Sequence, residues 1–190
     1  MLQTDLFLAL VRAISAQQIT LSFAARLRGR LAERFGESHR VAGEEVRRLD
    51  PARLADVRIA ELRALQFSTA KAQAIVGVAA AVASGHISLD RLRGLPDEEV
   101  VSRLTELRGI GRWSAEWILV RTLGRHRVVA GDLGVRKAVG RAYLKAALPS
   151  EAEVRLATAH WGDAAAIAQQ LTLHALIEGA LEQPPVGTPR

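Results

Sequence analysis

Leu107-Arg-Gly-Ile-Gly-Arg-Trp-Ser-Ala-Glu-Trp117 decides the fold, because this stretch joins the end of one helix to the start of another through two glycines. Gly109 and Gly111 lack a Cβ atom, so the backbone can turn through positive φ there and a bulky group can approach closely. The next helix starts at once, so its first N–H groups point out of the hairpin with the positive end of the helix dipole behind them. Such a site binds a phosphate without any basic side chain, and Arg108 and Arg112 flank it.

A carboxylate follows this hairpin at the start of another helix. Gly131-Asp132 lies fifteen residues beyond Trp117. An aspartate in this position is usually an N-cap, which needs no catalytic role. Together with the anion-binding hairpin, it also indicates an acid held near a bound strand. Both interpretations stay open from the local pattern.

The composition limits the class of protein. The 190 residues suffice for one domain or for two small lobes that share a groove. The net charge of +6 favours DNA or RNA as partner, since neutralised phosphates release counterions, although a solvated basic surface is the plain alternative. The absence of cysteine excludes disulfides and iron–sulfur clusters and permits an intracellular location. No stretch approaches the roughly 20 apolar residues of a membrane span, so no membrane partner is expected.

Helical periodicity dominates the chain, and no segment shows the sustained alternation of a half-buried strand, so an all-α fold is predicted. Capping residues mark where helices begin: Asp50 before Pro51, Ser68, Asp132 and Ser150. Gly36, Gly85 and Gly124 mark helix ends, and a last helix is expected from Asp163 to about Ala180. Residues 182–190 are predicted to be a flexible tail.

The order of hairpin, tryptophan and aspartate resembles the helix-hairpin-helix (HhH-GPD) DNA glycosylases. Within that superfamily the chain is most similar to the 3-methyladenine DNA glycosylase II, or alkylpurine-DNA glycosylase, branch. The residues that carry the resemblance are Arg12–Ile19, Leu107–Ala115 and Val128–Asp132, with weaker similarity over Leu62–Gly85. It covers roughly residues 6–144.

The resemblance implies a single catalytic domain of two helical lobes with the active-site cleft between them. Lobe one is expected at 26–124, including the hairpin 105–113, and lobe two at 1–25 plus 125–181, with no extra N-terminal domain. The implied activity is that of a monofunctional glycosylase that removes alkylated purines, chiefly 3-methyladenine, from damaged double-stranded DNA in base excision repair. A monomer acting inside the cell is expected.

Asp132 matches the catalytic aspartate of the superfamily. Departure of the base builds positive charge on the sugar, which an ionised carboxylate stabilises while it orients or deprotonates the attacking water. Trp113 stands where the lyases of the superfamily carry the lysine that forms a Schiff base, and an indole cannot do that chemistry. The resemblance therefore implies no lyase activity.

The expected base pocket consists of Trp113, Trp117 and Leu133. The two tryptophans are four residues apart on one helical face, where they suit a flipped, cationic purine by stacking and cation–π attraction. Filling of the core is the alternative for both. Leu133 stands where an aromatic residue is common in the family.

The expected DNA contacts lie at four places in the chain. Gln18, with Gln17 beside it, is expected to enter the gap that the flipped nucleotide leaves, and an exposed turn glutamine is the alternative. Phosphate contacts are expected at Gly109, Gly111, Arg112, Ser114, Lys71 and Arg136. Solvated surface charge is the alternative for Lys71 and Arg136.

No cofactor is expected to be required. The resemblance makes the hairpin a candidate site for a structural Na+ or K+ held by the backbone carbonyls of Thr105, Leu107 and Ile110. The five histidines show no metal-ligand spacing, so a catalytic metal is not expected.

Two other functions stay open from the sequence. A helix-hairpin-helix module without catalysis would only hold duplex DNA, and such a module needs neither Asp132 nor the tryptophan pair. A glycosylase for etheno or deaminated bases would keep the mechanism and change the lesion.

Overall fold

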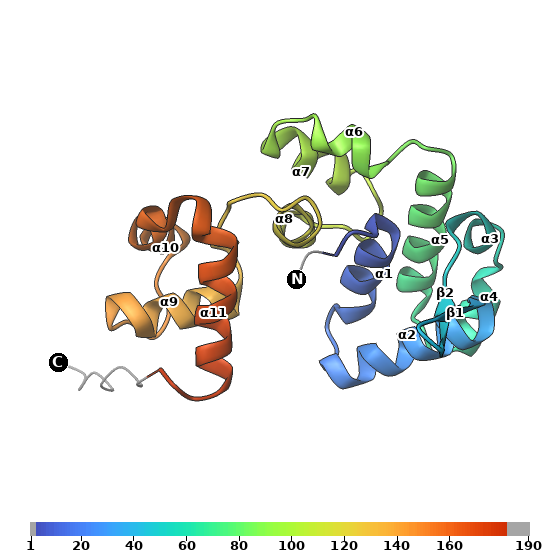
Figure 1. Ribbon diagram of the computed structural model, residues 1–190, viewed down its shortest axis with the longest axis horizontal. Helices are drawn as coiled ribbons and strands as arrows, with labels where there is room; N and C mark the ends of the chain where they lie inside the picture. The colour runs from blue at the N-terminus through green and yellow to red at the C-terminus, as the bar shows by residue number, and fades with distance from the viewer. Residues whose placement is uncertain (1–2, 182–190) are drawn as a thin grey trace. The chain divides into compact units, whose positions relative to one another are not determined.

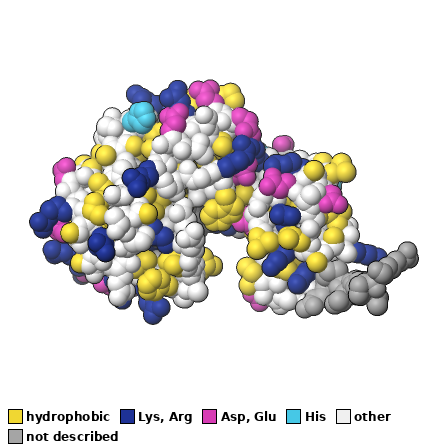
Figure 2. Space-filling view, turned by 180° about the vertical axis from the view of Figure 1, so that it is seen from behind, with side chains coloured by type: hydrophobic (Ala, Val, Ile, Leu, Met, Phe, Trp, Pro, Cys, Tyr) yellow, Lys and Arg dark blue, Asp and Glu magenta, His cyan; other side chains and the backbone are white. Residues whose placement is uncertain are grey.

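The computed structural model describes residues 3–181 and is mostly helical, as predicted (Figure 1). The chain divides into two compact units, Met1–Ile118 and Leu119–Arg190. No helix within residues 3–181 is long and apolar enough to cross a lipid bilayer. Lys and Arg side chains are distributed over both units on the face shown in Figure 2, with acidic side chains between them. The predicted tail 182–190 lies outside the described residues.

The first unit is built around a small-residue helix. α5 (Thr69–Ala83) begins at the predicted cap Ser68, whose hydroxyl accepts the Lys71 N–H, and α1 (Leu6–Ala16) and α3 (Pro51–Ala55) pack against α5 (Figure 1). Buried alanines of α5 allow this close approach, and the core is filled by larger apolar side chains such as Leu10 and Ile75. The remaining elements are α2 (Leu21–Phe35), β1 (Glu37–Val41), β2 (Glu44–Arg48), α4 (Ile59–Ala64), α6 (Leu89–Arg93), α7 (Asp97–Thr105) and the start of α8 (Arg112–Arg121).

The strands β1 and β2 form an antiparallel hairpin that the sequence pattern did not predict. Val41 pairs with Glu44, so the loop is Ala42-Gly43, with φ of 52° and 87°. Positive φ at both loop residues suits the right-handed twist of a tight hairpin. All residues of both strands are exposed, so no alternation of apolar and polar residues marks them. Ala42 also stands where an asparagine or aspartate would have indicated the turn.

The second unit consists of α9 (Leu133–Val139), a π-helical turn (Gly140–Leu144), α10 (Glu151–Thr158), a 3-10 turn (Ala159–Ala164) and α11 (Ala165–Ile177). The predicted capping box at the start of α10 is confirmed: the Ser150 hydroxyl accepts the Glu153 N–H, and the Glu153 carboxylate accepts the Ser150 N–H in return. The Ser150 hydroxyl and N–H hold the pKa of Glu153 below its usual value. The last helix begins two residues later than predicted, because Gly162 is in a non-helical conformation with φ of 49°.

The described contacts of α1 lie in the first unit, where it packs against α2 and α5. From the sequence we predicted that residues 1–25 form one lobe together with residues 125–181. The unit boundary also falls within α8, between Ile118 and Leu119, rather than after residue 124. The proposed grouping into lobes stays a prediction.

Candidate functional site

The two glycines of the hairpin between α7 and α8 have different tasks. Gly109 has φ of +83°, and a Cβ there would lie 2.7 Å from the Ala74 Cβ, so both the turn and its packing on α5 require glycine. Gly111 does not adopt positive φ, which corrects the expectation for this position. Its carbonyl accepts the Ala115 N–H at 3.0 Å as the first bond of α8. A Cβ on Gly111 would meet nothing within 4 Å, so the space beside it is open to a ligand.

The turn after α1 is tied to this hairpin by side chains. Gln17 Nε2 donates to the Gly109 carbonyl oxygen at 2.7 Å, so its amide fixes the hairpin and would have to leave that bond to intercalate. Gln18 follows with φ of 56°, a left-handed conformation that places it at the apex of the turn. Intercalation by Gln18 stays a prediction.

Lys71 has a structural partner that the sequence did not indicate. Its Nζ donates to the carbonyl oxygens of Ser15 at 2.9 Å and Gln17 at 2.7 Å, at the C-terminal end of α1. Partial burial lowers the pKa of the Lys71 ammonium from its ordinary value, because it removes water from the charge. These two bonds hold the turn that carries Gln18. The ammonium group has a third N–H donor, so a phosphate contact by Lys71 stays a prediction.

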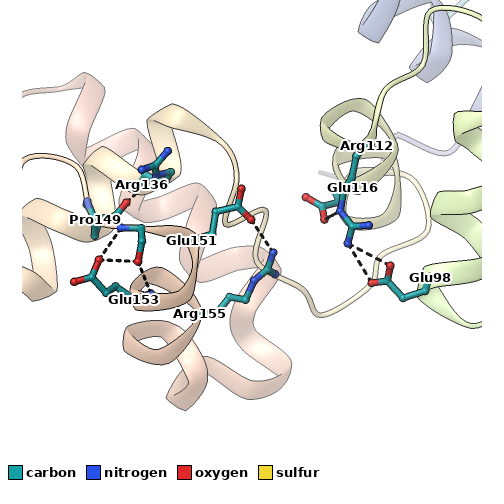
Figure 3. Close-up of polar contacts among 9 residues, drawn as sticks. Glu98, Arg112, Glu116, Arg136, Pro149, Glu151, Glu153 and Arg155 are labelled. Carbon is teal, nitrogen blue, oxygen red and sulfur yellow. Dashed lines mark hydrogen bonds and ion pairs between the residues drawn. The ribbon is translucent and has the colours of Figure 1, made fainter.

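Arg112 is engaged by two carboxylates (Figure 3). Its Nη2 lies 3.2 Å from Glu98 Oε2 and its Nε lies 3.1 Å from Glu116 Oε1. The Glu116 side chain is only 4% exposed, whereas that of Glu98 is 64% exposed. A phosphate that binds Arg112 would therefore exchange with Glu98, because the buried bond to Glu116 fixes the direction of the guanidinium. Ser114 is 2% exposed, so its hydroxyl is not at the surface where a phosphate contact was expected.

The two tryptophans of α8 differ in burial. Trp113, in the first turn, is 45% exposed, whereas Trp117 is 7% exposed and belongs to the core. The sequence left core packing open for both tryptophans. The structure shows that Trp117 packs in the core, whereas Trp113 does not. A half-exposed tryptophan is the informative case, since burial is the usual state of so large an apolar side chain.

Asp132 begins α9 in the second unit. Its Oδ1 accepts the Val135 N–H at 2.9 Å, and its own N–H donates to the Val129 carbonyl oxygen at 3.0 Å. The predicted N-cap is thus confirmed, and an N-cap carboxylate is held in one orientation by the helix it starts. Leu133, next to it, is 53% exposed. A Cβ on Gly134 would lie 3.0 Å from Asp132 Oδ1, so glycine leaves room for the carboxylate.

Arg136 lies one turn further along α9 and is not a free surface charge. Its Nε donates to the Pro149 carbonyl oxygen at 2.7 Å, which ties α9 to the segment before α10 (Figure 3). The guanidinium has further N–H donors, so a phosphate contact by Arg136 stays a prediction.

Sequence reasoning missed Gln169 in α11. Its side chain is fully buried and binds the backbone of the segment that leads to Asp132. The only signal was a pair of glutamines, Gln169 and Gln170, inside an otherwise apolar run. Such a pair does not reveal which member is buried.

The proposed cation site fits the chemistry of the hairpin carbonyls. Carbonyl oxygens are ligands for hard cations. The Leu107 carbonyl accepts the Ile110 N–H at 3.0 Å and keeps a second lone pair. A structural Na+ or K+ at Thr105, Leu107 and Ile110 stays a prediction. Within residues 3–181, His, Asp and Glu side chains form no group of three or more suited to a metal ion.

Comparison with known proteins identifies relatives of the chain. A family model described as HhH-GPD superfamily base excision DNA repair protein matches residues 11–163. The DNA-3-methyladenine glycosylase of Bacillus subtilis (strain 168) is 34% identical over 128 residues, 63% of this chain and 40% of that protein. DNA-3-methyladenine glycosylase 1 of Schizosaccharomyces pombe is 32% identical over 129 residues, 67% of this chain and 53% of that protein.

A solved structure extends the similarity to the fold. The 3-methyladenine DNA-glycosylase from Archaeoglobus fulgidus matches with a TM-score of 0.76 at 31% identity, over 90% of this chain and 58% of that one. The chain spans about half the length of the curated relatives it matches.

Proposed function

We propose, from the premise that the chain belongs to the HhH-GPD superfamily of base excision DNA repair proteins, that it is a DNA glycosylase. Its reaction is hydrolysis of the N-glycosidic bond of alkylated purines, chiefly 3-methyladenine, in damaged duplex DNA, and it acts as a monomer. The names of the relatives in Bacillus subtilis, Schizosaccharomyces pombe and Archaeoglobus fulgidus support this substrate class.

The exposure of Trp113 is the observation that best supports the proposal. It is 45% exposed in the first turn of α8, directly after the glycine hairpin. A 3-alkylated purine in DNA carries positive charge, and an exposed indole face attracts a cation that stacks on it. A module that only holds the DNA backbone has no use for an exposed tryptophan, because phosphate contacts do not read bases.

Asp132 supplies the carboxylate for the hydrolysis. The C1′–N bond breaks and its electron pair leaves with the cationic base, which departs neutral, while positive charge develops on the sugar. An ionised Asp132 stabilises that charge electrostatically. Water then forms the new C1′–O bond and gives its proton to the carboxylate or to solvent. The bond from the Val135 N–H holds one carboxylate oxygen in place during this change of charge.

The chain is proposed to lack lyase activity. Trp113 has no amine, and Lys71 donates to two backbone carbonyls. Borohydride present during turnover should trap no efficient protein–DNA adduct, and the product strand should stay intact until alkali or heat breaks it at the abasic site. Efficient trapping by the unmodified protein would overturn the monofunctional mechanism.

Release of bases from methylated duplex DNA tests the activity directly. The protein is incubated with the duplex, and the released bases are identified by chromatography, with the duplex incubated without protein as the control for spontaneous depurination. We expect 3-methyladenine to exceed the control. Duplex binding without base release would favour a helix-hairpin-helix module without catalysis. Base release only from duplexes with etheno or deaminated bases would change the proposed substrate class to those lesions.

A further inference from the structure

The side chain of Gln169 in α11 is the most deeply buried amide near the start of α9. It is 0% exposed, its Oε1 accepts the Val129 N–H at 3.0 Å, and its Nε2 donates to the Arg127 carbonyl oxygen at 2.8 Å. Burial of an amide is costly unless both of its ends find partners. Here both ends do, and both partners belong to one backbone segment.

This segment has no regular secondary structure of its own. Residues 124–129 are neither helix nor strand, so their backbone is not fixed by a ladder of hydrogen bonds. Gln169 binds Arg127 and Val129, two alternate residues, as a neighbouring strand would. The Gln169 side chain therefore ties the segment to α11 at two backbone groups.

The same segment leads directly to Asp132. The Val129 carbonyl oxygen accepts the Asp132 N–H at 3.0 Å, and Asp132 Oδ1 then accepts the Val135 N–H at 2.9 Å. Hydrogen bonds thus link Gln169 through the Val129 backbone to the Asp132 N–H, and the carboxylate of the same residue caps α9. All of its members lie in the second unit.

A second contact from α11 reaches the same point. A Cβ on Gly134 would lie 3.0 Å from Leu173 Cδ2 and also 3.0 Å from Asp132 Oδ1. Leu173 is one helical turn beyond Gln169 on α11, so both residues share a face. α11 therefore contacts the backbone before Asp132 and the backbone after it.

We propose that Gln169 is a positioning residue that sets the orientation of the Asp132 carboxylate through the backbone of Val129. The inference rests on the proposed function, because the orientation of Asp132 matters for excision only if Asp132 acts in it. Gln169 itself touches no reacting atom. Its loss should lower the rate of the chemical step and leave DNA binding unchanged.

Gln169→Leu and Gln169→Glu test the proposal, with Gln170→Leu as the matched control on the exposed face of α11. Single-turnover excision of methylated duplex should slow about 10- to 100-fold in Gln169→Leu, the scale for misplacing a catalytic group. Duplex Kd should stay unchanged, and Gln170→Leu should match the unaltered protein. A merely structural role predicts a smaller active fraction at an unchanged rate constant, which would overturn the proposal.

Gln169→Glu gives a readout that damage to the fold does not imitate. A protonated carboxyl can accept from the Val129 N–H and donate to the Arg127 carbonyl as the amide does, whereas an ionised one cannot donate. The rate of this variant relative to the unaltered protein should therefore rise as the pH falls from 8 to 6. A ratio that does not change with pH would contradict the proposal, and the variant keeps the test available if Gln169→Leu does not fold.

Hydrogen exchange separates failure of this inference from failure of the proposed function. In Gln169→Leu, the amides of Val129 and Asp132 should exchange faster, while those of α10 stay protected. If the unaltered protein excises no base, the proposed function fails, and the positioning role of Gln169 in catalysis fails with it, whatever the exchange shows. If it excises and Gln169→Leu keeps its rate, only the positioning role is overturned.

Discussion

The N-termini of α8 and α9 both attract negative charge, but they differ in what occupies them. The first turn of α8 contains no acidic residue and follows the open space beside Gly111. The start of α9 is occupied by the carboxylate of Asp132, which caps the Val135 N–H. A helix N-terminus attracts negative charge, and the question at each end is whether the charge comes from the protein or from a ligand. In the proposed function, the start of α8 leaves that place for a DNA phosphate, whereas the start of α9 fills it with the carboxylate of Asp132.

Both ends also expose a large apolar side chain next to their polar group. Trp113 is 45% exposed in the first turn of α8, and Leu133 is 53% exposed in the first turn of α9. The support behind each end differs. Gln17 fixes the hairpin before α8 from the turn after α1, and Gln169 fixes the segment before α9 from α11. Under the proposed function, the start of α8 binds DNA and the start of α9 carries the catalytic carboxylate, and substitutions at each helix start test these two roles.

The largest effect is expected for Asp132→Asn. Asparagine caps a helix about as well as aspartate, so the melting temperature should change little. Excision in single-turnover assays should fall by at least ~100-fold, the scale for losing one electrostatic contact to the transition state. Duplex binding should persist, because Asp132 is not among the residues proposed to hold phosphate.

Asp50→Asn is the matched control for this substitution. Asp50 caps α3 through the Ala52 N–H at 3.0 Å, so the chemistry of the change is the same at a helix outside the proposed site. Its excision rate should equal that of the unaltered protein. An Asp132→Asn protein that melts normally and excises normally would remove Asp132 from catalysis and reduce α9 to an ordinary capped helix.

Gly109→Val is expected to lower both the stability of the fold and the affinity for DNA. A branched side chain at φ of +83° and 2.7 Å from Ala74 should destabilise the fold. Left-handed strain and overpacking together cost roughly 2–6 kcal/mol. Thermal unfolding measures this loss. Among molecules that remain folded, duplex binding should weaken equally for damaged and undamaged DNA.

Gly111→Ala isolates the phosphate contact from the strain. No atom lies within 4 Å of the added Cβ, so the melting temperature should be kept. Binding to both duplexes should weaken about 10- to 100-fold if the methyl group displaces one charge-assisted hydrogen bond of about 1.5–3 kcal/mol. Weakening for the damaged duplex alone would contradict the phosphate assignment and, with it, the binding role of the α8 end.

The helix starts were predictable because their signals are local. Asp50, Ser68, Asp132 and Ser150 each cap a backbone N–H two or three residues away, so type and spacing suffice to predict them. The hairpin β1–β2 was missed because its strands are exposed on both faces and its turn is Ala42-Gly43. An alternation of burial was absent, and alternation is the usual signal of a strand.

The site residues were predictable by type but not by partner. Lys71 is 56 residues from Ser15 in the chain, and Arg136 is 13 residues from Pro149, yet each side chain binds a carbonyl of that partner. Sequence spacing shows a basic residue near a motif and leaves open whether a phosphate or a carbonyl receives its N–H groups. Gln169 was missed for the same reason, since its partners lie 40 and 42 residues away.

The smallest effect is expected for Trp113→Ala. This substitution tests whether the start of α8 contacts the flipped base as well as a phosphate. The side chain is 45% exposed, so its removal should cost little stability, whereas Trp117→Ala at 7% exposure should cost about 3–5 kcal/mol as a core truncation. Loss of a cation–π contact of roughly 0.5–2 kcal/mol corresponds to an excision rate lower by about 2- to 30-fold for cationic purines. Neutral lesions lack the charge and should lose less. Rates should be measured on duplexes with 3-methyladenine and with a neutral etheno base, at equal DNA occupancy. Equal losses on both would contradict the cation–π contact, because the contribution of Trp113 would then not depend on the charge of the base.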